Sequence, residues 1–379
     1  MAIFLSHSGT AMFSNPEPSR DLFVGTVEGL FHLRREDGGQ WRNAGQSLAD
    51  KHVCSLAREE VTGTLIAGTH NGGVAVSEDD GATWEFRNEG LASLNVFSVA
   101  ASNVDGEVRL YAGTEPAHLY LSTDLGKSWT ELDGLRSAPN LDDWTFPPPP
   151  HEAHVKYITF DPADPNCIYA CVEQGELLRS TDGGKVWEDL LTRAGVAKEA
   201  EGDAHRLLIR PEHPDKLFMP TGFGLFVSED TGKTWRNLKE QLPAIGYPDP
   251  MVFDPNRQNL LFVAGGKLNP GHWIPSRNAN ASIARSRDGG DSWEVVNNGL
   301  PAPMTASIEA MMIESHGQSC SVFVGTTDGD VYCSTDDGES WTRIAQGLPP
   351  VSKGVHFLLA KGLIGGPPPP GIEGAGPPA

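Results

Sequence analysis

The chain has 379 residues and carries 50 acidic and 29 basic side chains, which gives a formal net charge of −21. This charge excludes nucleic acid and anionic membrane surfaces as favoured partners, because both are themselves negatively charged. The length is large for one ordinary domain, but architectures that grow by repetition reach it as a single domain.

The N-terminal stretch "MAIFLSHSGTAMF" has no basic region and only a few consecutive apolar residues. It therefore predicts neither a signal peptide nor a membrane span. The five cysteines are an odd number and fall inside predicted strands, which is typical of buried reduced thiols. Together these features predict a cytoplasmic protein.

The chain is built of repeated units, whose motif is described below. The stretch "TAMFSNPEPSRDLFVGT" is expected to form the innermost and second strands of the first unit. The C-terminal "GVHFLLAKG" also resembles an innermost strand. The two chain ends are therefore alternatives for closing a ring of repeats.

An eight-residue motif with Ser, Asp, Gly and Trp at fixed spacing recurs along the chain, as in "SEDDGATW". An altered first copy, "RREDGGQW", ends at Trp41, lacks one residue and has arginine in place of the serine. Ser and Asp can hydrogen-bond to the backbone of a tight turn, Gly supplies a positive φ, and Trp opens the next strand. The motif thus predicts a hairpin turn. The six intact copies begin at Ser77, Ser122, Ser180, Ser228, Ser286 and Ser334.

Upstream of each turn lie two further apolar runs, such as "VCSLA" and "LIAGT" in the second unit. Each unit therefore contains four short strands, and the motif tryptophans are 43 to 58 residues apart. This period and content are typical of a propeller blade. We expect an all-β fold, a seven-bladed β-propeller with four-stranded blades over residues 1–364. The Pro- and Gly-rich residues 365–379 are expected to be disordered.

The octapeptides resemble the Asp-box, or BNR, repeats of sialidase-type β-propellers. This superfamily also includes sortilin-like receptors, some glycoside hydrolases and photosystem assembly factors. The resemblance covers nearly the whole chain and implies the propeller fold. It also implies that the Asp-box turns are structural and face away from the active site.

Histidines recur where the predicted innermost strands begin. His52, His154, His205 and His356 all lie at or one residue before such a start, and Glu309 falls at the matching place. Because innermost strands run parallel around a propeller axis, these side chains are expected to converge at the mouth of the axial channel. A single such histidine is more often structural, but imidazoles in register suit a transition metal. We therefore predict one Zn, Fe, Mn or Cu ion held by the four histidines.

Loops on the same face supply further candidates. His70 and His118 could move protons beside the metal, and Glu309 could help the histidines to hold the ion; these three are the predicted catalytic residues. Ordinary polar loop residues are the alternative interpretation. Glu115, Glu173 and Asp328 could bind substrate or orient a ligand. Residues of two long loops could cover the channel, namely Asp142, Asp143, Trp144, His151, His272, Trp273 and Arg277.

These patterns favour a metal-dependent enzyme, a hydrolase, lyase or oxygenase, that acts on a small organic molecule. One alternative is a non-catalytic binding or assembly propeller. The other is a sialidase-like glycoside hydrolase, for which the resemblance implies three arginines, a tyrosine nucleophile and an early "FRIP" segment. The chain has no "FRIP", and its "LIRP" at Leu208–Pro211 lies mid-chain.

Overall fold

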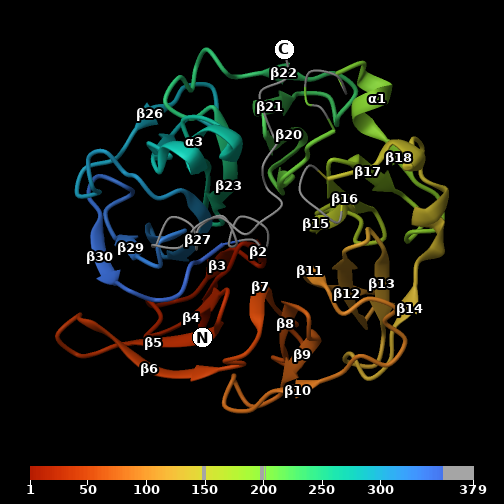
Figure 1. The fold of residues 1–379 in the computed structure, drawn as a ribbon, viewed down its shortest axis with the longest axis horizontal. Helices are drawn as coiled ribbons and strands as arrows, with labels where there is room; N and C mark the ends of the chain where they lie inside the picture. The colour runs from red at the N-terminus through yellow and green to blue at the C-terminus, as the bar shows by residue number, and fades with distance from the viewer. Residues whose placement is uncertain (147–150, 197–199, 201, 353–379) are drawn as a thin grey trace. The chain divides into compact units, whose positions relative to one another are not determined.

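The computed structural model describes residues 1–146, 151–196, 200 and 202–352, so the predicted disordered tail at 365–379 lies outside the described residues. The chain is a seven-bladed β-propeller of four-stranded blades (Figure 1). This confirms the predicted fold. The contacts divide the chain into unit 1, with residues 1–7, 11–49 and 238–379, and unit 2, with residues 8–10 and 50–237. A single domain over residues 1–364 stays a prediction.

Unit 2 contains four blades, and each is an antiparallel sheet whose strand order follows the chain. The short strand β2 (Ser8–Gly9) adds to the first of them by pairing in parallel with β7. The blades are β7 (His52–Arg58), β8 (Leu65–His70), β9 (Gly73–Ser77) and β10 (Glu85–Phe86); β11 (Val96–Val104), β12 (Glu107–Thr114), β13 (Leu119–Ser122) and β14 (Thr130–Glu131); β15 (His154–Phe160), β16 (Ile168–Glu173), β17 (Glu176–Ser180) and β18 (Glu188–Asp189); and β19 (Leu208–Arg210), β20 (His213–Thr221), β21 (Gly224–Ser228) and β22 (Arg236–Asn237).

Unit 1 contains three blades, and two of them include strands from the N-terminus. These blades are β1 (Ile3–Leu5), β4 (Asp21–Thr26), β5 (Gly29–Arg35) and β6 (Trp41–Ser47); β23 (Tyr247–Asp254), β24 (Arg257–Gly266), β25 (Ser282–Ser286) and β26 (Glu294–Val295); and β27 (Ile308–His316), β28 (Ser319–Thr326), β29 (Val331–Ser334) and β30 (Thr342–Ala345), with β3 (Met12–Ser14) beside β27.

The N-terminal strands differ from the expected arrangement. The innermost strand of the first blade is Ile3–Leu5, which pairs in parallel with β4. The stretch around Met12, expected in that position, pairs in parallel with β27 instead. Both segments are short apolar runs, so the local pattern alone could not assign them to a sheet.

The repeated motif forms the turn between the third and fourth strands of six blades. In the first intact copy, the Ser77 hydroxyl lies 2.8 Å from Asp79 Oδ1 and accepts a hydrogen bond from the Gly81 amide at 2.9 Å. Gly81 has a φ of +86°, a conformation that favours glycine. The Asp79 carboxylate also accepts from the Thr83 amide at 2.8 Å. The motif therefore holds its own turn by local hydrogen bonds, as predicted.

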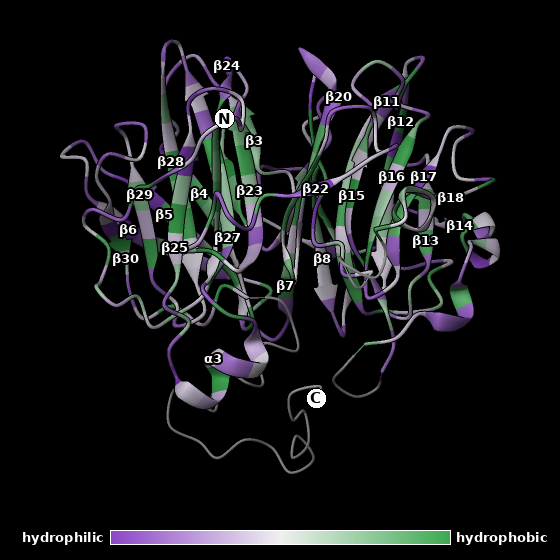
Figure 2. Cartoon of the chain, turned by 90° about the horizontal axis from the view of Figure 1, so that it is seen from above, coloured by the Kyte–Doolittle hydropathy of each residue, from purple (hydrophilic) through white to green (hydrophobic). Residues whose placement is uncertain are grey.

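Apolar side chains fill the space between neighbouring blades of unit 2. Trp129, Trp187 and Trp235 each belong to a hydrophobic cluster made by two adjacent blades. Figure 2 shows the hydrophobic residues along the strands and hydrophilic residues in the connections. Burying one such indole typically contributes about 3 to 5 kcal/mol, measured as the cost of Trp→Ala. The motif thus supplies both the turn and an apolar side chain that packs between neighbouring blades.

The helices whose bounds lie within the described residues are short: the 3-10 helices η1 (Asp133–Ser137) and η2 (Leu141–Asp143), and the α-helices α1 (Leu190–Ala194) and α3 (Pro270–Ser276). Asp189 caps α1, because its Oδ1 accepts from the Leu191 and Thr192 amides at 2.8 and 3.0 Å. Within the described part of the chain, no helix has the length and apolar character needed to cross a membrane.

Candidate functional site

A cluster of buried charged residues lies in unit 2 where innermost strands begin and where second and third strands join. Glu173 is the last residue of β16, and its register partner across the sheet is His154, the first residue of β15. His205 lies three residues before β19 and is fully buried. The hairpin register therefore brings the Glu173 carboxylate to the His154 ring.

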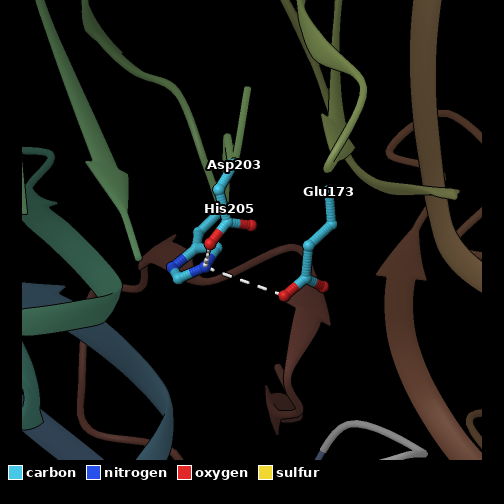
Figure 3. Close-up of side chains that lie close together, drawn as sticks. All are labelled: Glu173, Asp203 and His205. Carbon is cyan, nitrogen blue, oxygen red and sulfur yellow. Dashed lines mark ion pairs between the residues drawn. The ribbon is translucent and has the colours of Figure 1, made fainter. Parts of the chain in front are cut away.

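Ion pairs converge on the Glu173 carboxylate. Its Oε2 lies 2.8 Å from His154 Nε2, and its Oε1 lies 3.5 Å from Lys156 Nζ and 3.7 Å from His205 Nε2. His205 Nε2 is also 3.4 Å from Asp203 Oδ2. Figure 3 shows the Glu173, Asp203 and His205 side chains directed toward one another. All five side chains are at most 7% exposed, so this is a buried network of carboxylates, imidazoles and one ammonium group.

A second carboxylate extends the network from the neighbouring blade. Glu115 follows β12, and its Oε2 lies 3.5 Å from His154 Nδ1 while its Oε1 lies 3.7 Å from His70 Nε2. The His154 ring stacks on Phe97 at a centroid distance of 3.9 Å and meets the edge of Phe146 at 5.0 Å. These aromatic rings exclude water from the imidazole and strengthen its electrostatic contacts.

The network shifts the pKa values of its members in opposite directions. Burial alone would lower the pKa of His154, but the carboxylates of Glu115 and Glu173 outweigh it and raise the pKa. Burial alone would raise the pKa of Glu115, but hydrogen bonding and charge from His154 and His70 lower it to about 2. His154 and Glu115 thus stabilise each other's charged forms.

A pocket of about 310 Å³ opens beside this network, over the turn between β16 and β17. Trp144 forms one wall, and its ring packs closely on Gly175, where an added Cβ would come within 3.0 Å of Trp144 Cδ2. Glu176 forms another wall and has a φ of +87°, which is strained for a residue with a side chain. The lining comprises Asn140, Asp143, Trp144, Thr145, Gln174, Gly175, Glu176, Thr192 and Gly202.

The Glu176 carboxyl differs from the carboxylates of the network. Its Oε2 is buried and has no hydrogen-bond partner among the described residues. Burial raises the pKa of Glu176 to about 7, and the nearby negative charge of Asp189 adds to the rise. The pocket therefore contains a carboxyl that can carry a proton near neutral pH.

The predicted catalytic residues are divided between the two units, and the two histidines of unit 2 contact different carboxylates. His70 reaches Glu115, as above, but His118 Nδ1 lies 2.7 Å from Glu131 Oε1 at the outer strands of its blade. Glu309 lies in unit 1, where the Ser352 hydroxyl donates to its Oε2 at 2.6 Å and His7 Nδ1 is 2.9 Å from its backbone oxygen.

The structure describes three of the four histidines predicted as metal ligands, and they make different contacts. His154 and His205 both contact Glu173, as described. His52 pairs in register with His70, with ring centroids 6.1 Å apart. His356 lies outside the described residues.

Within the described residues, one group of three could place ligand atoms within 4.8 Å of one another, namely Glu173, Asp203 and His205. Lys156 and His154 already supply positive charge to this group, at 3.5 and 2.8 Å from Glu173. That positive charge would repel an added divalent cation at close range. The ion pairs with Lys156 and His154 therefore explain why the three side chains lie close together.

Sequence reasoning missed Lys156, Asp203 and Glu176. Lys156 is the one charged residue in "HVKYITF", and it lies two positions after His154 on the same face of the strand. Asp203 lies two residues before His205 in "GDAHR". The signal for Glu176 was its place beside Gly175 in a turn between second and third strands. Trp144, expected to cover the channel, lines the pocket.

Comparison with known proteins gives partial matches. Residues 175–300 match the Sortilin-Vps10 family model, described as sortilin, neurotensin receptor 3. Xyloglucanase Xgh74A of Acetivibrio thermocellus is 28% identical over 239 residues, which are 54% of this chain and 27% of that protein. The oligoxyloglucan-reducing end-specific xyloglucanase of Emericella nidulans is 27% identical over 274 residues, which are 61% and 31%. The chain spans about a quarter to a third of the length of these relatives.

Two solved structures share the fold. An ancestral GH74 enzyme superposes with a TM-score of 0.55 at 17% identity, covering 75% of this chain and 37% of that one. YCF48 bound to D1 peptide superposes with a TM-score of 0.55 at 15% identity, covering 87% of this chain and 94% of that one. At these identities the superpositions show the propeller fold alone.

These relatives correct the predicted function. A metal-dependent enzyme acting on a small organic molecule is wrong, because the relatives are xyloglucanases, whose substrate is a polysaccharide. They also give no support to metal binding or to a cytoplasmic location, and the location stays a prediction. The alternative of a glycoside hydrolase agrees better with them.

Proposed function

We propose that this chain binds and hydrolyses a β-linked polysaccharide of the xyloglucan type, and that the pocket over the β16–β17 turn is its active site. The observation that carries the proposal is the combination of the Trp144 ring and the protonatable Glu176 carboxyl in one pocket of about 310 Å³. The 28% identity to a xyloglucanase over 239 residues supports the choice of substrate.

Trp144 provides the surface on which a sugar ring binds. An indole ring offers a large apolar face, which suits the C–H face of a pyranose. The surrounding Asn140, Thr145 and Gln174 carry amide and hydroxyl groups that can hydrogen-bond to sugar hydroxyls. The pocket is therefore suited to a neutral, hydroxyl-rich ligand.

Glu176 is the proposed general acid. It would donate its proton to the glycosidic oxygen while the bond between that oxygen and the anomeric carbon breaks, so the leaving sugar departs as an alcohol. A water molecule would then add to the anomeric carbon and give its proton to Asp143, the other carboxylate in the lining. The raised pKa of Glu176 keeps the acid protonated near neutral pH.

The test is hydrolysis of xyloglucan by the full chain, measured as released reducing ends, with binding measured by affinity electrophoresis. Glu176→Gln is expected to abolish hydrolysis and to retain binding. Trp144→Ala is expected to weaken both. A matched control is Glu89→Gln, which removes an exposed carboxyl elsewhere in unit 2. Full activity of Glu176→Gln would reject this site.

A second candidate is a non-catalytic binding propeller. One protein that shares the fold over 94% of its chain, YCF48, has a structure with a bound D1 peptide. Binding without hydrolysis by both the wild type and Glu176→Gln would support this candidate. We further propose that the six intact octapeptides are Asp-boxes, because their Ser, Asp and Gly form the same turn in each blade.

A further inference from the structure

The first copy of the repeat departs from the other six in its turn. Arg35 stands where the intact copies have a buried serine, and Asp37 stands where they have the aspartate that holds the turn. Asp37 instead forms an exposed ion pair with Arg20, at 2.7 Å between Oδ1 and Nη1. The turn is closed by backbone bonds between Glu36 and Gln40 and between Gly39 and Glu36, at 2.8 and 2.9 Å.

The motif tryptophan of this copy lies against the arginine. Arg35 and Trp41 are register partners across β5 and β6, and Arg35 Cζ lies 5.9 Å from the centroid of the Trp41 ring. The ring meets Phe323 of β28 edge-on, with centroids 5.8 Å apart. Trp41 keeps part of its surface exposed, as do Trp84 and Trp293 of two intact copies, whereas Trp129 and Trp187 are buried.

A pocket of about 230 Å³ lies beside Trp41 within unit 1. β6 and β30 lie side by side there (Figure 1). The walls of this pocket carry the Arg35 guanidinium and the Trp41 and Phe323 rings. They also carry the hydroxyls of Ser19, Ser321, Thr335, Ser340 and Thr342.

Glu314 brings a negative charge to the same pocket. Its side chain is buried, and its Oε1 accepts hydrogen bonds from Asn15 Nδ2 at 2.7 Å and from the Ser19 amide at 2.8 Å. Arg35 disfavours a cation in the pocket, and Glu314 disfavours an anion. A neutral ligand with many hydroxyls is compatible with both charges.

We propose that this pocket binds one neutral sugar unit of a glycan, as a binding site separate from the one beside Glu176. The aromatic ring of Trp41 would contact the sugar face, and the Ser and Thr hydroxyls would hydrogen-bond to its edge. The volume is below the 300 to 1,000 Å³ typical of pockets for drug-sized ligands, which suits a single ring.

The experiment measures the affinity of the full chain for a xyloglucan heptasaccharide and for cellobiose by isothermal titration calorimetry. It uses the Glu176→Gln background, so that the ligand is not consumed. Trp41→Ala is expected to weaken one of two binding events about tenfold, which corresponds to the loss of one stacking contact. The matched control is Trp84→Ala, which removes the tryptophan of an intact copy, and it is expected to leave both events unchanged.

Arg35→Ser, which restores the residue of the intact repeat, provides a second test if Trp41→Ala does not fold. It is expected to weaken the same binding event several-fold. A folded Trp41→Ala or Arg35→Ser protein that keeps both events unchanged overturns the proposal. Loss of hydrolysis in Glu176→Gln with the Trp41-dependent event retained separates this site from the proposed active site.

Discussion

Replacing Glu176 by glutamine is expected to make the protein more stable at alkaline pH while it abolishes hydrolysis. The pKa of the carboxyl is about 7 in the folded protein and 4.5 when unperturbed, because burial disfavours its charged form. A difference of this size corresponds to at most about 3.5 kcal/mol, since one pKa unit is worth about 1.4 kcal/mol. Partial solvent exposure of the group reduces the expected effect to about 2 kcal/mol.

The sign of the effect follows from proton linkage. Between pH 4.5 and about 7 the folded state holds the Glu176 proton and the unfolded state releases it, so the free energy of unfolding falls as the pH rises. Below pH 4.5 both states are protonated, and above pH 8 both are ionised, so the contribution is constant there. A glutamine at this position stays neutral throughout, so the fall in the free energy of unfolding with rising pH is removed.

The assay is urea denaturation at several pH values between 4 and 8.5, followed by tryptophan fluorescence. The difference in free energy of unfolding between Glu176→Gln and the wild type is expected to grow by about 2 kcal/mol from pH 4.5 to pH 8. Glu89→Gln is the control for a change of net charge, and its difference from the wild type is expected to stay flat. Parallel curves for Glu176→Gln and the wild type would refute the argument that burial raises this pKa.

Three further predictions concern the buried network and the turns. Glu173→Gln removes the carboxylate that contacts both His154 and Lys156 and leaves Glu115 as the carboxylate beside His154, so the free energy of unfolding at pH 6 is expected to fall by about 3 kcal/mol; a change below 1 kcal/mol would contradict the network. Burial alone would raise the pKa of Glu115, but its histidine partners lower it to about 2. The free energy of unfolding of the wild type is therefore expected to fall more steeply than that of Glu115→Gln between pH 4.5 and 2. Equal slopes of the two proteins in acid titrations would contradict the lowered pKa. Asp182→Ala removes the acceptor of three turn hydrogen bonds and is expected to cost about 1 to 2 kcal/mol with xyloglucan binding unchanged; lost binding in a stably folded variant would show that the turn contributes to function.

The turns could be predicted from the sequence because their contacts are local. Ser180 reaches the amide of Gly184, four residues away, at 2.8 Å, so the motif contains all the groups that it needs. The strand count followed from the same repeat. The pairing of Met12 with β27 could not be predicted, since it joins segments about three hundred residues apart and the alternatives have similar apolar patterns.

The site was predictable in part for the same reason. His154 and Glu173 were recognised as positions at strand ends on one face, but their mutual contact depends on the hairpin register. A carboxylate within reach of an imidazole competes with a metal ion for it, and the sequence pattern carries no information about that competition. The pocket carboxyl of Glu176 depends on burial and on a backbone conformation with φ of +87°, which only the folded chain defines.

Two glutamates three residues apart on the β16–β17 turn occupy opposite electrostatic environments. Glu173 faces His154, Lys156 and His205, whereas the charge acting on Glu176 among the described residues is the like charge of Asp189. A glycoside hydrolase needs one carboxyl that keeps its proton and a rigid support that holds it in place. The ion pairs of Glu173 fix the end of β16, and the absence of a described cation beside Glu176 leaves its proton available. Placing a cation there should therefore remove the acid without disturbing the support, so Thr192→Lys is expected to lower the pKa of Glu176 and to shift the alkaline limit of hydrolysis to lower pH. An unchanged pH profile of hydrolysis in this variant would show that another group supplies the proton.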